Sequence, residues 1–455
     1  MNRIPFYSSV AGGMDCRLES GLLPASTTAG WTYGAAAGAV PVVVWLLALA
    51  RAAVSLEKSK WQLGTANLAG VLLCLGGLGL LYSVWRNRHL SQVIWGRRVR
   101  YLFAALLAWC VVIVVRVDWR DFWWQVRPAW AGQYFAWAWV VPASMVLGAD
   151  MRIWRQAFKA SVAVSGLGCF VLVCGWVMIS LRGDFSFTQV SPVLLLFYHY
   201  FTIRWRRIIL LGTLISLLLS ILAATRNEVL STGLLMLGAG YIQFQRHQLW
   251  RTRTRVCIFG LFALALGAVL YVASVDHVPL VGDTINSGID RFKDKLMKNT
   301  RSTVEGESLY SEFFSDVQGL DLVIGRGCMG IYRTNLGSLD SGVYEMGRRH
   351  IECGYLQVIL HGGLVALVLI LTLAVPAIYL GLFRSRNWFA QGCALLVITR
   401  LCEMVPFGLP SADVRYMLFW MAIGACLAYD IRMLSEDQCA VALGNWRAPV
   451  YRWCQ

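Results

Sequence analysis

Charged residues are scarce in this sequence, and their scarcity excludes a soluble globular protein. Only 15% of the 455 residues are charged, whereas 58% are hydrophobic, and the mean hydropathy is +0.58. A water-soluble chain of this length cannot bury so much apolar surface in one or two cores. The 20 Trp, 17 Tyr and 20 Phe are instead typical of a protein whose many helix ends lie among lipid headgroups. The composition therefore predicts an integral membrane protein.

The sequence also lacks the patterns that bind metals or cross-link small domains. Its 13 Cys lie mostly inside apolar runs and form no CxxC pair, so we expect neither a zinc site nor a disulfide framework. No cluster of Asp residues offers a cage for a divalent cation. We therefore expect no metal and no cofactor. Cys328 and Cys353 stand in segments expected outside the membrane, and no pattern supports a bridge between them, although their positions permit one.

A continuous basic patch is missing as well, despite a net charge of +16. The Lys and Arg residues fall in short clusters between apolar runs, which is how membrane proteins set their orientation. This distribution excludes nucleic acid as a partner. No linker rich in Pro, Ser or Gly divides the chain, so we expect one membrane domain.

Apolar runs dominate what is present. Twelve of them approach the length needed to cross about 30 Å of hydrocarbon. Because the runs 101–115 and 188–203 are short, ten or eleven crossings remain an alternative. The expected fold is all-α, a polytopic membrane protein with about 12 transmembrane helices. The runs are 34–51, 63–85, 101–115, 130–148, 159–181, 188–203, 208–225, 229–244, 256–275, 351–383, 388–406 and 415–434.

The loops between these runs alternate in charge. One set of alternate loops holds 17 Lys/Arg and one acid, whereas the other holds 7 basic and 6 acidic residues. Since basic loops stay in the cytoplasm, we place the first set and both termini inside. The first set comprises 86–100, 149–159, 204–207, 245–255 and 384–387, and the second comprises 52–62, 116–129, 182–191, 226–228 and 407–414.

One long polar segment interrupts the pattern and lies outside by the alternation. Residues 276–350 hold 11 of the 25 acids and 9 basic residues, and the segment is too long for a turn. We expect a small helical periplasmic domain, with a surface helix over 283–298 and a second helix over 305–317. The predicted division is 1–275 for helices one to nine, 276–350 for the loop domain and 351–455 for the last three helices.

Ionisable side chains at or within apolar runs are costly in lipid and are candidates for function. Arg226 and Glu228 stand at the tip of a tight hairpin on the expected outer face, where an ordinary turn is the alternative. Arg400 and Glu403 lie three residues apart, and therefore on one helix face. That intramembrane polar pair either serves function or merely neutralises itself and locks the bundle.

Charged residues cluster over 348–352, where the expected outer domain meets the next apolar run. A helix beginning there would place Arg349 and Glu352 along one face, with His350 about 200° away from Glu352. The helix dipole also favours an acid in a first turn, which is the structural alternative for Glu352.

Several motifs follow one another in order over roughly 200–375. They are Thr225-Arg226, Arg301…Glu305…Phe313-Phe314, Ile324-Gly325-Arg326-Gly327, and Ile351-Glu352-Cys353-Gly354-Tyr355-Leu356-Gln357…Gly362-Gly363-Leu364. The set resembles the Wzy-type polysaccharide (O-antigen) polymerases, which form one superfamily with the O-antigen ligases. Each motif alone is weak, but their order, spacing and expected position outside the membrane make the set more specific. The two glycines would also allow a bend or the close approach of another helix.

The resemblance implies a metal-independent glycosyltransferase that uses undecaprenyl-diphosphate-linked sugars at the periplasmic face of the bacterial inner membrane. Polymerases transfer the growing glycan to the next lipid-linked repeat unit, and ligases transfer it to lipid A–core. The implied partners are the lipid-linked oligosaccharide and membrane lipids, with a chain-length regulator as a further candidate. Many members have His at the start of the helix. Here Glu352 holds that position and His350 stands two residues earlier, so the identity of the base is open.

The chemistry of such a transfer needs residue types that the outer segments contain. A diphosphate leaving group is matched by guanidinium forks, and an acceptor hydroxyl needs a positioned general base. A transporter or flippase is the non-enzymatic alternative, but such proteins tend to have internal repeats and short outer loops. The candidate bases are Glu352, His350 and Glu305, and the candidate diphosphate-binding residues are Arg226, Arg301, Arg326, Arg348 and Arg349.

Overall fold

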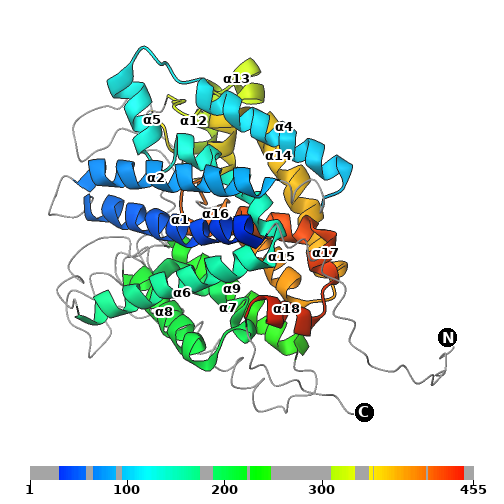
Figure 1. The fold of residues 1–455 in the computed structure, drawn as a ribbon. Coiled ribbons are helices and arrows are strands. Elements are labelled where there is room, and N and C mark those ends of the chain that lie inside the picture. The colour runs from blue at the N-terminus through cyan, green and yellow to red at the C-terminus, as the bar shows by residue number, and fades with distance from the viewer. Residues whose placement is uncertain are drawn as a thin grey trace, which may run out of the picture.

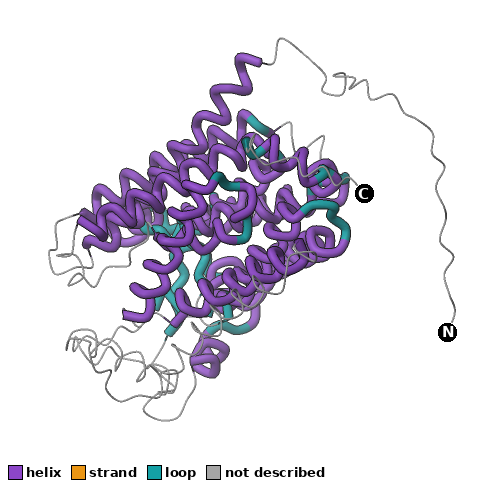
Figure 2. The backbone as a smooth tube through the Cα atoms, turned by 90° about the horizontal axis from the view of Figure 1, so that it is seen from below, coloured by secondary structure: helices purple, strands orange, loops and turns teal. Residues whose placement is uncertain are grey.

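The described part of the protein is helical. A computed structural model describes residues 30–57, 65–88, 95–174, 188–222, 226–246, 309–333, 348–351, 353–405 and 408–444. Within these residues, the only strand-like pairing is a single antiparallel bridge between Tyr332 and Arg348. Figure 2 accordingly shows helices joined by short loops and no strand. The predicted all-α class is confirmed for these residues.

The helices vary widely in length. The longer ones are α1 (Gly30–Glu57), α2 (Thr65–Arg86), α4 (Arg97–Val115), α6 (Met151–Cys174), α8 (Ile203–Leu222), α9 (Arg226–Arg246), α14 (Gly354–Phe383), α15 (Trp388–Glu403) and α16 (Val414–Leu427). The shorter ones are α5 (Arg127–Ala131), α7 (Ser191–Leu195), α12 (Leu309–Asp316), α13 (Gly319–Ile324), α17 (Tyr429–Met433) and α18 (Glu436–Ala442). A π-helical turn, η1 (Phe122–Val126), and 3-10 segments η2 (Ala136–Trp139), η3 (Val141–Ala149), η5 (Thr188–Val190) and η6 (Tyr198–Tyr200) connect them.

Three helical stretches in the described residues are long and apolar enough to cross a membrane. They are Asn67–Arg86, Arg97–Val115 and Gly354–Phe383. Shorter apolar stretches cover Ala39–Val54, Ala136–Ala149 and Val414–Leu427. On the three long stretches, Leu78, Val111 and Val368 are each more than half exposed, and a bilayer would cover such a surface. The helices thus support the membrane class that the composition predicts.

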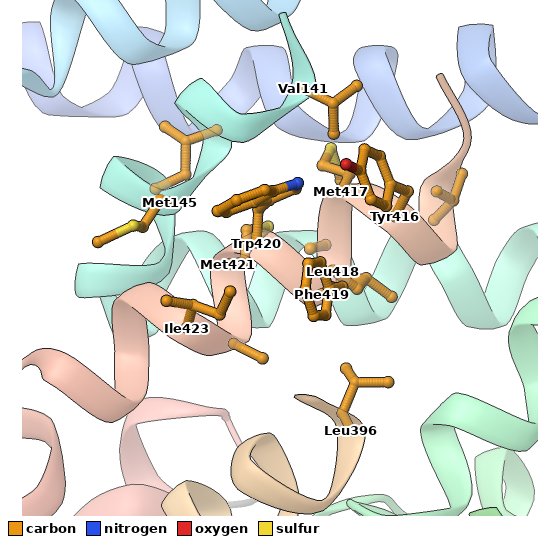
Figure 3. Packing of buried hydrophobic residues seen from close by; sticks show 14 of the residues in the cluster. Val141, Met145, Leu396, Tyr416, Met417, Leu418, Phe419, Trp420, Met421 and Ile423 are labelled. Carbon is orange, nitrogen blue, oxygen red and sulfur yellow. The ribbon is translucent and has the colours of Figure 1, made fainter. Parts of the chain in front are cut away.

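The helices are arranged around α16. Figure 1 shows α1 and α2 side by side, with α4, α12 and α13 on one flank and α6, α8 and α9 on the other. Every residue of α16 except Arg415 is buried, because η3, α14 and α15 pack around it. Figure 3 shows Trp420 and Met417 of this helix close to Val141 and Met145 of η3. α16 therefore forms the centre of the core and presents one charged side chain at its start.

Most predicted apolar runs coincide with a helix, but two do not form one continuous α-helix. The run 130–148 is divided among α5, η2 and η3, and the run 188–203 among η5, α7 and η6. Close backbone packing accompanies the first of these, since a Cβ at Gly148 would lie 1.9 Å from the Met421 carbonyl oxygen. The predicted helix over 305–317 is confirmed in part as α12. The predicted segments 256–275 and 283–298 lie outside the described residues.

Helix α14 bends at Gly363, whose φ of +68° and ψ of −175° are outside the helical region. The bend frees three carbonyls, which then accept other hydrogen bonds. Arg326 N donates to Leu360 O at 2.7 Å and Gly327 N to His361 O at 2.9 Å. Trp109 Nε1 donates to Gly362 O at 2.7 Å. The predicted bend is therefore confirmed, and the turn after α13 is the element that occupies it.

Candidate functional site

A small pocket lies where α1, η5 and the start of α16 meet. Its volume is about 20 Å³, room for a single water molecule. A larger group would therefore bind at its mouth or displace side chains. The lining combines apolar and charged residues: Leu47, Ala48, Arg51, Gln189, Val190, Asp413, Val414 and Arg415.

Arg415 and Glu228 form a bidentate ion pair beside this pocket. The distance from Arg415 Nη1 to Glu228 Oε2 is 2.6 Å, and that from Nη2 to Oε1 is 2.9 Å. Both side chains are largely buried, so water screens the pair only weakly. Glu228 stands in the first turn of α9, where the helix dipole also stabilises a carboxylate. The pair joins the first turn of α9 to the first turn of α16.

Asp413 caps α16 and faces several arginines. Its Oδ1 accepts a hydrogen bond from Tyr416 N at 2.8 Å, and its Oδ2 accepts one from the Ser411 hydroxyl at 2.7 Å. Burial by itself raises the pKa of Asp413, but Arg415, Arg400 and Arg51 together hold that pKa below its ordinary value. Asp413 is therefore a carboxylate at neutral pH, held between cations.

This depressed pKa predicts how stability depends on pH. Asp413 contributes stability above its unfolded pKa, and that contribution is lost as pH falls through the lower folded pKa. We expect the Tm of the wild type to decline below about pH 4, and to decline less steeply in Asp413→Asn, which already lacks the contribution. Thermal unfolding in detergent between pH 7 and pH 3 measures this. The exposed control Asp437→Asn should retain the wild-type slope, and a wild-type slope in Asp413→Asn would contradict the assignment.

Arg51 connects the pocket to the segment that contains His350. Arg51 Nη1 donates to the Tyr134 hydroxyl at 2.8 Å. The His350 ring lies edge-on to Tyr134, with centroids 5.3 Å apart, and stacks on Phe135 at 5.2 Å. Arg349 Nη2 donates to Trp124 O at 3.3 Å. Of the residues predicted for the site, His350 thus lies beside the Tyr134 that Arg51 contacts, whereas Arg349 contacts Trp124 in η1.

Helix α14 begins later than the sequence predicts. Its first residue is Gly354, so the predicted helix face that joins Arg349 to Glu352 is wrong. Two interactions fix residues 348–351 outside a helix. Arg348 pairs with Tyr332 through hydrogen bonds of 2.8 and 2.9 Å, and the Gln357 amide bonds Ile351 N and Arg349 O.

The guanidinium of Arg326 bonds residues close to it in the chain. Its Nη1 lies 2.5 Å from Asp316 Oδ2 and its Nε 2.8 Å from Asp321 Oδ2. Nη1 also donates to Ile331 O. Partial burial lowers the pKa of Arg326, but the two carboxylates more than compensate and the net shift is upward. This bonding favours a structural role that holds α12, α13 and residue 331 together.

Arg400 and Glu403 form a buried pair, with 2.8 Å between Nη1 and Oε2. Arg400 Nη2 also donates to Leu409 O at 2.6 Å, and the guanidinium lies over the Tyr416 ring. The pair therefore clamps the loop before α16, which supports the alternative that it locks the bundle.

Several predicted site residues cannot be compared with the described geometry. Arg301, Glu305 and Glu352 lie outside the described residues, as does the side chain of Arg226, the first residue of α9. Cys328 and Cys353 are free, buried thiols, so the two do not form a bridge.

The sequence reasoning missed Arg51, Asp413 and Arg415. Each stands at the boundary of an apolar run, as Arg226 does, and that criterion applied at every boundary would have found them. What the sequence could not supply is their convergence, which depends on how α1 and α16 pack.

The chain matches no family model, no curated protein and no solved structure.

Proposed function

We propose that this protein is a glycosyltransferase of the bacterial inner membrane, with about twelve crossings and a helical periplasmic domain. It would polymerise undecaprenyl-diphosphate-linked oligosaccharide repeat units at the periplasmic face. The observation that carries the proposal is the pocket in which Arg51, Asp413 and Arg415 meet, with His350 beside the Tyr134 that Arg51 contacts.

Arg51 supplies a guanidinium at the pocket for the leaving group, whereas both Nη atoms of Arg415 already bond Glu228. Guanidinium forks match phosphate oxygens in a bidentate manner and stabilise the charge that develops on a departing diphosphate. In the transfer, the bond between the sugar anomeric carbon and the diphosphate oxygen breaks. A new bond forms from the acceptor hydroxyl oxygen to that carbon, and the hydroxyl proton passes to the base. The candidate bases are His350, Glu352 and Glu305, and His350 lies beside the Tyr134 that Arg51 contacts.

The contacts between helix ends support a common outer face. Loop charge assigns the end of α1 and the starts of α9, α14 and α16 to the periplasm. The pocket brings Arg51 at the end of α1 to the start of α16, and Glu228 joins the start of α9 to the same place. Gly354 N at the start of α14 donates to Met404 O at the end of α15.

Helix ends that loop charge assigns to the cytoplasm also contact one another. Asn387 Nδ2 donates to Ile431 O at 2.7 Å, and the Tyr200 hydroxyl donates to Glu436 Oε2 at 2.7 Å. The grouping of ends is the one that an alternating topology requires.

The lipid-bound product distinguishes the polymerase from the other candidate functions. Cells that lack lipid A–core should still accumulate long glycans on undecaprenyl diphosphate if the protein is a polymerase. An O-antigen ligase would leave single-length lipid-linked glycan in those cells. A flippase would change the side of the membrane on which the glycan lies and not its length. Electrophoresis of lipid-extracted glycans separates the three outcomes.

The base can be identified by two conservative variants, Glu352→Gln and His350→Gln. If one of these residues is the base, its replacement should slow chain growth by about 100-fold or more, because a positioned base accelerates the reaction by that much. Polymer length in membranes at matched protein level measures the effect. His199→Gln, at the end assigned to the cytoplasm, is the control. Wild-type polymer in both variants would exclude both residues.

A further inference from the structure

A group of aromatic side chains is exposed directly after α4. Trp123 is 66% exposed and Trp124 is 74% exposed, and Trp119 and Phe122 are each more than half exposed. Large apolar side chains that remain together on a surface mark a contact with a partner or a membrane. We call residues 116–127, which contain all four, the aromatic segment.

The backbone of the aromatic segment is held in place while its rings stay outside. Asp121 Oδ1 accepts from Trp124 N at 3.0 Å and caps the turn η1. Trp119 Nε1 donates to Val115 O at 3.0 Å, which folds the segment back on the end of α4. Trp124 O accepts from Arg349 Nη2 at 3.3 Å, which ties the segment to the residue before His350. The exposure of the rings is therefore a feature of an ordered structure.

Arginines alternate with these rings. Arg116, Arg120 and Arg127 are all exposed, and the Arg127 guanidinium lies 5.4 Å from the centre of the Trp123 ring. Asp118 and Asp121 accept hydrogen bonds from backbone N–H groups of the segment itself. The outward surface thus combines indole rings with cations.

The position of the segment indicates what covers it. α4 is one of the three helices able to cross a membrane, and its exposed Val111 and Val115 precede the exposed Trp119 at intervals of four residues. Arg116 Nη1 also donates to Ile324 O at the end of α13, so α13 with its exposed Leu320 lies next to the aromatic segment. Aromatic rings and arginines gather at the depth of the headgroups, where an apolar ring body and a polar edge are both solvated.

We propose that the aromatic segment binds the phospholipid headgroup layer, with its arginines on lipid phosphates and its indoles at the edge of the hydrocarbon. The entrance to the pocket would then lie at headgroup depth, because the Arg349–Trp124 contact joins the segment to the residues around His350. The binding of phospholipid is independent of the glycosyl transfer proposed above.

A photocrosslinking amino acid placed at position 123 or 124 tests this proposal. The full chain would be reconstituted in vesicles of phosphatidylethanolamine and phosphatidylglycerol that contain a labelled phospholipid. Two positions give the controls: 438, an exposed site in the polar first turn of α18, and 78, an exposed site in the middle of α2. We expect lipid adducts at 123 and 124 comparable to those at 78 and about tenfold above those at 438.

Two results would overturn the proposal. One is lipid adduction at 123 and 124 as low as at 438, with adduction at 78 retained. The other is adduction at 123 and 124 that a soluble glycan, added as dextran oligomers, displaces at both positions. The second result would identify the rings as a sugar-stacking surface. Neither result depends on whether the protein polymerises glycans.

Discussion

Arg51→Lys is expected to reduce glycan chain growth by about 100-fold or more while the protein remains folded, because loss of one preorganised donor at a developing anion has an effect of this size. Lysine retains the positive charge but not the planar fork that matches two phosphate oxygens. Arg51 lines the pocket and donates to Tyr134, and Asp413 also faces Arg415 and Arg400, so this carboxylate keeps two other arginines near it when Arg51 is replaced. The measurement is polymer length on undecaprenyl diphosphate in membranes that contain equal amounts of each variant.

Arg97→Lys supplies the matched control for this substitution. Arg97 also bonds a tyrosine, since its Nε donates to the Tyr101 hydroxyl at 3.1 Å. It is exposed, however, and is the first residue of α4, at the end assigned to the cytoplasm. Its replacement should leave chain growth within about twofold of the wild type, as expected for a surface substitution. Equal losses in the two variants would show that any arginine–tyrosine pair has this effect, and the pocket would not be the site.

Gly363→Ala is expected to destabilise the protein by about 3 kcal/mol or more. The φ of +68° with a ψ of −175° belongs to a region that only glycine adopts readily, and strain of this kind costs about 1–3 kcal/mol. A Cβ would also lie 2.1 Å from the Val323 carbonyl oxygen, a backbone atom that cannot rotate away. To relieve this clash, α14 would have to move away from the turn at Arg326 and Gly327, whose N–H groups donate to the Leu360 and His361 carbonyls.

Thermal unfolding in detergent measures the effect of Gly363→Ala, with Gly233→Ala as the control. Gly233 is in α9, and nothing lies within 4 Å of a Cβ built there. That substitution should leave the Tm unchanged or raise it, since alanine favours a helix more than glycine does. A Tm for Gly363→Ala equal to that of the wild type would contradict the account of the bend.

The sequence predicted the helices well where apolar runs were long and uninterrupted. The runs 208–225 and 388–406 correspond to α8 and α15 within a few residues. The run 130–148 failed because apolar composition does not distinguish an α-helix from 3-10 segments, and the choice there depends on the close approach of α16 to η3. The predicted start of α14 was wrong because the Gln357 side chain and the bridge to Tyr332 hold residues 348–351 outside the helix. Neither interaction is visible in a local pattern.

The candidate site was predictable in part. Charge before an apolar run directed attention to His350 and Arg349. His350 lies beside the Tyr134 that Arg51 contacts, whereas Arg349 contacts Trp124. The role of Glu228 became clear only from its ion pair with Arg415, which follows it by 187 positions in the chain. Long-range pairing of this kind cannot be read from one sequence without other sequences to reveal it.

Binding of undecaprenyl diphosphate to the purified full chain is the most direct measurement of whether arginines at this pocket hold a lipid diphosphate. Native mass spectrometry in detergent reports the bound lipid without any knowledge of the sugars. We expect a bound lipid in the wild type and in Arg97→Lys, and about tenfold weaker binding in Arg51→Lys, the loss of one charge-assisted hydrogen bond. Equal affinity in all three proteins would mean that Arg51 does not touch the lipid diphosphate, and the proposed site would have to be abandoned.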